Sequence, residues 1–266
     1  MQFTPASFRA ALRLTVLSVI LFSASQAQAA AIYLAFSGFD LTVLGVTNLT
    51  TGIVNPAEFQ ISGEAVIVET EDFSFGGGSA DALAVPEVIG VDPDNLGIDE
   101  GVGSFAGVSG EVVGSGLAGS SAVTDSFLRF ANFSATDTYQ FDLLLDYFLF
   151  ADAFATDPFF GFAFSEAFLD VFSDGGLIVS ETASAFSNEP TDVIEDFLSF
   201  DITLGPGGSD EVTIFADAFG VAAEIPEPST VWLLGAGAAM LLIGRSRSRQ
   251  RAGGADRSSA SRSFSS

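Results

Sequence analysis

The strongest constraint on the fold is a period-two alternation of apolar and polar residues in the middle of the chain. Between Tyr139 and Phe150, every second residue from Tyr139 to Leu149 is Tyr, Phe or Leu, and these residues form one face. Gln140, Asp142 and Asp146 lie on the other face. Similar alternation occurs in residues 32–46, 58–69, 197–204 and 211–218. Side chains of a β-strand point alternately to two faces, so the pattern predicts half-buried strands. Turn residues between them favour an all-β fold, an antiparallel β-sandwich of jelly-roll-like type, over residues 30–225.

Three segments are harder to assign. Residues 157–176 have helix start and stop signals with Phe at every fourth position, but Gly161 and the high Phe content favour a strand. Residues 191–199 could begin as a helical turn before a strand. Residues 97–120 are rich in glycine, which predicts a loop or a weak strand.

Charge is segregated along the chain and excludes several functions. The sequence has 9 basic and 34 acidic residues, for a net charge of −25, and it contains no His, Cys or Lys. A catalytic triad, a thiol nucleophile and an ordinary zinc site are therefore excluded. Nucleic acid is not an expected partner, because its binding requires phosphate neutralisation. In residues 30–228, Arg129 is the only basic residue.

The N-terminal residues 1–29 have the three-part order of a secretory signal peptide. Arg9 and Arg13 precede an apolar run at Leu14–Phe22, which is too short to span a bilayer. The small residues that follow predict cleavage by signal peptidase between Ala29 and Ala30.

The C-terminal region has a second ordered set of features. Pro226, Glu227 and Pro228 precede an uncharged, mostly apolar segment at residues 229–244. A helix of that length would rise about 24 Å, a short but acceptable membrane span. The basic cluster that follows would remain on the cytoplasmic side and stop transfer, and it comprises Arg245, Arg247, Arg249 and Arg251. The prediction is a transmembrane helix that holds the chain in the inner membrane transiently.

This order resembles the PEP-CTERM sorting domain of exported bacterial proteins. The resemblance covers residues 226–251 and rests on the motif Pro226, Glu227, Pro228, the apolar span and the Arg cluster. It implies processing near the motif by an exosortase, a membrane cysteine transpeptidase, and often an association with exopolysaccharide or biofilm matrix. The motif residues are substrate, so the resemblance implies no catalytic residue. Residues 252–266 extend beyond the usual end and predict a disordered tail.

One acidic segment is a candidate calcium site. Asp92, Asp94, Asp99 and Glu100 surround a turn glycine, and calcium prefers such oxygen ligands. The spacing does not fit an EF-hand loop, and the alternative is a solvated acidic turn. No other cofactor is predicted.

The sequence therefore predicts an exported, non-catalytic protein of the cell surface or extracellular matrix. Its expected partners are signal peptidase and exosortase during export, and polysaccharide afterwards. One alternative is a secreted carbohydrate-binding module that uses exposed aromatic residues such as those in 159–164. A further alternative is a glycoside hydrolase that relies on carboxylates alone.

Overall fold

The computed structural model describes residues 31–156, 161–189 and 191–224. The predicted signal peptide with its cleavage site, the sorting motif, the membrane span, the Arg cluster and the tail lie outside these residues. The described elements are β1 (Ala31–Asn48), a 3-10 turn η1 (Pro56–Glu58), β2 (Phe59–Ile89), β3 (Gly101–Asn132), β4 (Tyr139–Ala155), β5 (Gly161–Ser173), β6 (Gly176–Phe186), β7 (Asp192–Leu204) and β8 (Ser209–Glu224). The prediction of an all-β chain is confirmed for this part. Nothing in it is a helix with the length and apolar character needed to cross a membrane.

All eight strands belong to one antiparallel sheet with the order β6-β5-β8-β3-β1-β4-β7, and β2 pairs with β3. The β3 strand pairs with β2 along most of its length. On its other edge, residues 101–112 pair with β1 and residues 116–131 pair with β8. The two halves of β3 therefore belong to two different groups of strands. The prediction of an antiparallel sheet is confirmed, and the structure adds that the sheet is continuous.

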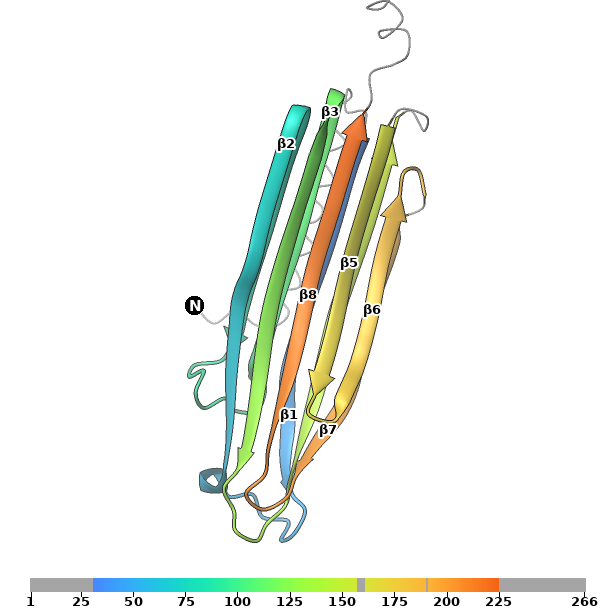
Figure 1. The fold of residues 1–266 in the computed structure, drawn as a ribbon. Helices are drawn as coiled ribbons and strands as arrows, with labels where there is room; N and C mark the ends of the chain where they lie inside the picture. Colours follow the sequence, from blue (N-terminus) through green and yellow to red (C-terminus); the bar gives the residue numbers. More distant parts are fainter. Residues whose placement is uncertain (1–30, 157–160, 190, 225–266) are drawn as a thin grey trace, which may run out of the picture. The chain divides into compact units, whose positions relative to one another are not determined.

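The long β2–β3 hairpin folds back on itself and turns this sheet into two layers. Ser104 and Thr124 both lie in β3, yet their hydroxyl oxygens are 2.5 Å apart. In an extended strand these residues would be about 66 Å apart. Midway between them, Gly114 has a positive φ of 81°, and the β2–β3 register shifts between Gly76 and Gly78. We call the layer with β8, β5 and β6 the first layer, and it includes the half of β3 that pairs with β8. The layer with β1, β4 and β7 is the second layer, and it includes the half of β3 that pairs with β1 (Figure 1). Each half of β2 belongs to the layer of the β3 half with which it pairs.

The glycine-rich stretch was predicted to be a loop or a weak strand, and from residue 101 onward it is a strand. It forms the first half of β3, the central strand of the sheet. The glycines are compatible with a strand because aromatic rings lie over them. A Cβ atom at Gly107 would meet the rings of Phe36 and Phe105, and one at Gly119 would meet the ring of Phe73. Glycine in a strand often marks such a close approach.

The other two ambiguous segments are strands. β5 begins at Gly161, as the favoured alternative predicted, although residues 157–160 lie outside the described part. β7 is extended from Asp192 onward, so the helical turn considered for residues 191–199 is not formed.

The core lies between the two layers and follows the alternation in the sequence. In β4, every residue of the predicted apolar face between Tyr139 and Leu149 is buried, whereas Gln140, Asp142 and Asp146 are partly exposed. A smaller apolar cluster lies on the outer side of the second layer, where the ring of Phe36 packs 5.5 Å from that of Phe105 and 5.8 Å from that of Phe150.

Polar side chains link the two layers through the core. The Ser37 hydroxyl donates to the Phe168 carbonyl at 2.9 Å, and the Ser165 hydroxyl donates to the Asp152 carbonyl at 2.9 Å. The Tyr33 hydroxyl lies 2.8 Å from the Ser120 hydroxyl, and the Tyr33 side chain is fully buried. Because buried polar groups are costly without partners, these bonds favour one alignment of the layers over others.

We predict that Gly220→Ala destabilises the protein strongly. A Cβ atom at Gly220 in β8 would overlap the ring of Tyr33, which enters from the opposite layer. Overpacking of this kind costs about 1–3 kcal/mol. Urea unfolding should therefore show a lower midpoint for this variant. Gly205→Ala is the matched control, since a Cβ atom there meets nothing within 4 Å. Equal midpoints for the two variants would contradict the packing of Tyr33 against Gly220.

Candidate functional site

The predicted calcium ligands lie in the loop between β2 and β3, where the carboxylates of Asp92 and Glu100 accept hydrogen bonds from the loop's own backbone. The Glu100 carboxylate accepts hydrogen bonds from the backbone N–H groups of Gly97 at 2.7 Å and Val91 at 3.3 Å. The Asp92 carboxylate accepts from the N–H of Asp94 at 3.1 Å. Asp99 donates its own N–H to the Val43 carbonyl in β1.

These contacts give the acidic loop a structural role. Across the described residues, no three acidic side chains gather in an arrangement that could hold a metal ion. The structure therefore does not bring Asp92, Asp94, Asp99 and Glu100 together as one ligand set. Their short-range spacing was the signal for calcium, and the same spacing serves to cap the turn.

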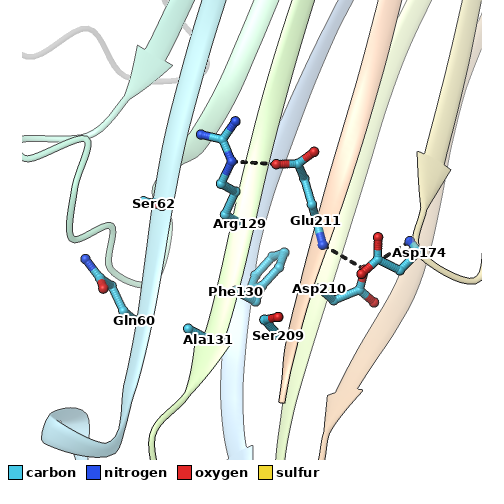
Figure 2. Close-up of a pocket in the computed structure, with 9 residues that line it drawn as sticks. All are labelled: Gln60, Ser62, Arg129, Phe130, Ala131, Asp174, Ser209, Asp210 and Glu211. Carbon is cyan, nitrogen blue, oxygen red and sulfur yellow. Dashed lines mark hydrogen bonds and ion pairs between the residues drawn. The ribbon is translucent and has the colours of Figure 1, made fainter. Parts of the chain in front are cut away.

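A shallow pocket of about 350 Å³ lies on the outer face of the first layer, around Arg129 (Figure 2). The Arg129 Nε group donates to Glu211 in β8 at 2.5 Å, and its Nη1 group donates to Glu64 in β2 at 3.0 Å. The guanidinium also lies 5.2 Å from the ring centroid of Phe127. Arg129 therefore links three neighbouring strands, as expected for the only basic residue among those described.

The rim of this pocket is held by backbone bonds to one carboxylate. Asp210 accepts hydrogen bonds from the N–H groups of Asp174 at 3.0 Å and Glu211 at 2.7 Å (Figure 2). Hydrogen bonds to Glu64 and Glu211 raise the pKa of Arg129, so it stays charged. The pocket is rich in carboxylates, and both Glu64 and Glu211 already bind its only cation.

A perturbed carboxyl group lies farther along the same face. Asp217 in β8 is opposite Val123 in β3 and Phe168 in β5, and its Oδ1 atom is buried without a hydrogen-bond partner. Burial raises the pKa of Asp217 to about 6, together with smaller contributions from the negative charges of Glu166 and Glu69. Sequence reasoning did not single out Asp217, because it occupies an ordinary outward position of an alternating strand.

The end of this face that lies nearest the β3 fold-back carries a cluster of aromatic residues. The ring centroid of Phe186 in β6 lies 5.2 Å from that of Phe162 and 5.4 Å from that of Phe164, both in β5. The ring centroids of Phe164 and Phe219, which is in β8, are 6.2 Å apart. Phe73 and Phe75 in β2 continue the surface beyond β3. The full set, which we call the aromatic end, is Phe73, Phe75, Leu117, Phe162, Phe164, Phe186 and Phe219. All except Phe164 expose at least a third of their surface.

Replacing Arg129 with Met should lower stability modestly and in a salt-dependent way. The change leaves Glu64 and Glu211 facing each other across β3 without a cation. Because all three side chains are about half exposed, we expect a loss of about 1 kcal/mol at low salt. Thermal unfolding at low and high salt measures this loss, and Glu64→Gln in the Arg129→Met background should recover part of it. A loss that is independent of salt would contradict the ion-pair explanation.

Asp217 should make the native state less stable as the pH rises from about 4 to above 6. In that range the unfolded carboxyl has lost its proton and the folded one still holds it, so ionisation opposes folding. Asp217→Asn should therefore raise stability at pH 7 by roughly 1 kcal/mol, allowing for solvent screening of a partly exposed group. The gain should vanish below about pH 4. Asp201→Asn removes the same charge from an exposed position and is the control; the same gain there would assign the effect to net charge.

Comparisons with known proteins bear on the C-terminal region alone. A family model described as the PEP-CTERM protein-sorting motif matches residues 224–250. A search of curated proteins returns no match. Among solved structures, the secreted serine protease VesC from Vibrio cholerae is 10% identical, with 68% of this chain and 50% of that chain covered and a TM-score of 0.10. The enzymatically active domain of tailspike protein 4 from bacteriophage CBA120 is also 10% identical, with 64% and 20% covered and a TM-score of 0.09.

The chain thus spans half or less of the length of these two structures, and likeness at this level supports no inference about fold or activity. The family match is different in kind, because it falls on the segment that the Pro226-Glu227-Pro228 order had singled out. It covers about a tenth of the chain and says nothing of the strands. Residues 224–250 are a PEP-CTERM protein-sorting motif, and the chain carries the sorting signal of an exosortase substrate.

Proposed function

We propose that this chain is an exported, non-catalytic protein of the cell surface or extracellular matrix. On this proposal the N-terminal signal peptide is removed after Ala29, and the span at residues 229–244 holds the precursor in the inner membrane. Exosortase then processes the chain near Pro226–Pro228, and the β-sandwich that contains the described strands remains outside with exopolysaccharide. The observation that carries the proposal is the match to the sorting motif.

The charge distribution supports the same route. In the described strands and loops, Arg129 is the only basic residue, whereas Arg residues flank both apolar segments at the ends of the chain. By the positive-inside rule, the C-terminal Arg cluster stays cytoplasmic and the acidic part is translocated. A strongly acidic outer surface also keeps the exported part soluble through self-repulsion.

The described sites support a role other than catalysis. The carboxyl group with the most clearly raised pKa, Asp217, lies on an open sheet face, and the pocket lies around Arg129. Asp217 and the pocket lie at different positions along the β3–β8 pair. Asp217 is opposite Val123, whereas Glu211 in the pocket is opposite Arg129. A glycoside hydrolase would need an acid and a second carboxylate at one substrate cleft. The separation disfavours the alternative of a carboxylate-only hydrolase.

A carbohydrate-binding module is the second candidate, and the exposed rings of the aromatic end favour it. Sugars bind to exposed ring faces, as other ligands do in concave aromatic sites. Here, however, Phe162 and Phe186 meet at 80° and Phe164 and Phe186 at 58°, so the rings do not form a coplanar platform. This geometry suits an apolar contact better than a row of stacked sugars. Calorimetric titration with matrix polysaccharides distinguishes the two candidates.

Processing at the motif gives a direct test of the proposal. Mass spectrometry of the protein released by its native host should find a C-terminus near Pro228, without the Arg cluster. A Pro226→Ala/Pro228→Ala chain should accumulate in the membrane as an unprocessed precursor, because the recognition motif is lost. Arg257→Ser, which changes the tail beyond the motif, is the matched control and should be processed normally. Released molecules that all retain the Arg cluster would refute the proposal.

A further inference from the structure

Six of the seven residues of the aromatic end occupy two successive uncharged rows of the first layer's outer face, and Phe219 lies in the row after them. Antiparallel pairing aligns Phe75, Leu117, Ala223 and Phe162 in one row across β2, β3, β8 and β5. The next row contains Phe73, Gly119, Val221, Phe164 and Phe186. Between the first row and the bend at Gly114, one further row pairs Gly76, Gly116, Glu224 and Gly161.

Charge begins abruptly in the rows that follow. Glu71 and Glu166 lie in the row of Phe219, and Glu69 and Asp217 lie in the next. In the second layer, Glu111 already lies opposite Ile32 at the corresponding end. The uncharged surface is therefore confined to one end of one layer. An exposed apolar patch with a polar border marks a contact surface for another body.

The covalent chain places a membrane close to this end. β8 leaves the sheet at Glu224, which pairs with Gly116 in β3 and Gly161 in β5, one position beyond the first uncharged row. The proposed membrane span begins at Ser229, five residues later. A fully extended chain of that length reaches at most about 18 Å. In the anchored precursor, Glu224, which adjoins the aromatic end in β8, is thus held within that distance of the bilayer surface.

We infer that the aromatic end contacts the lipid headgroup and acyl boundary of the membrane that anchors the precursor. This inference rests on the proposed membrane span. Moving exposed Phe and Leu side chains from water into the boundary region is favourable in free energy. Apolar faces enter this region by about 5–10 Å. The acidic rows stay in solvent, so the first layer is oriented with its aromatic end toward the bilayer. Release by exosortase removes the tether and, with it, the high local concentration of lipid.

The chain offers a clean test because it contains no cysteine. Phe75→Cys places a fluorescent label in the aromatic end, and Phe133→Cys places it in the β3–β4 loop at the opposite end of the strand. The two native rings are 79% and 62% exposed, so both changes spare the core. Phe162→Cys gives a second reporting position on another strand, and thermal unfolding of each labelled chain checks that it is folded. Each full chain is incorporated into phosphatidylcholine vesicles that carry nitroxide-labelled acyl chains.

The label at residue 75 or 162 should show blue-shifted emission, stronger quenching by the nitroxide lipid and weaker quenching by aqueous iodide than the label at residue 133. Vesicles rich in phosphatidylglycerol should weaken the difference, because the acidic rows are repelled by an anionic surface. Chains that float with the vesicles while all three labels remain fully accessible to iodide would overturn the inference and leave the membrane span intact. Chains that do not float would overturn the proposed span, and the inference with it. Shielding that requires exosortase in the vesicles would assign the surface to a protein partner and overturn the lipid contact.

Discussion

The fold-back of β3 is the constraint on which the other features depend. A strand of 32 residues is far longer than a small domain can accommodate in one direction, and its two halves face each other across the core. The Ser104–Thr124 hydroxyl pair closes this fold on the inside, and Gly114 permits it at the bend. Gly76 matches it in β2, where a side chain would overlap the Ser115 carbonyl. Because β1 pairs with one half and β8 with the other, a single hairpin defines both layers.

The acidic surface is compatible with this fold because the core needs no charge. Where the layers meet, their polar links are hydroxyl groups and backbone carbonyls, as at Tyr33–Ser120 and Ser37–Phe168. Carboxylates are instead placed on outer faces and on sheet edges. β2 pairs only with β3 among the described strands, and its 31 residues would be an open template for another chain. Six acidic residues, Pro86 and two register shifts interrupt that edge, which are known ways of preventing edge-to-edge association.

Sequence reasoning was most successful where alternation alone determines burial. The apolar face of residues 139–149 and the strands around 32–46 and 211–218 follow directly from it, because one face of each meets the core. It could not decide between a loop and a weak strand for residues 101–120, because glycine content gives no preference for a strand. Those glycines accept rings from residues distant in the sequence, such as Tyr33 over Gly110, and a single sequence does not reveal such a contact. The acidic loop was recognised as a unit, but local spacing could not show that Glu100 would bind Gly97 and Val91. Asp217 gave no local signal, since its burial depends on neighbouring strands.

The same fold-back also gives the two ends of the described domain a common position. Ala31 pairs with Val112 and Glu224 pairs with Gly116, so both lie within a few residues of the bend in β3. The segment that precedes Ala31 and the sorting motif that follows Glu224 therefore leave the domain at the same end. Strands that begin and end there can pair without threading either terminus through the sheet. On the outer face of the first layer, the two paired rows that contain Phe75 and Phe73 are uncharged, and Glu71 and Glu166 lie in the next outward row. The common position of the two termini therefore follows from where one strand folds.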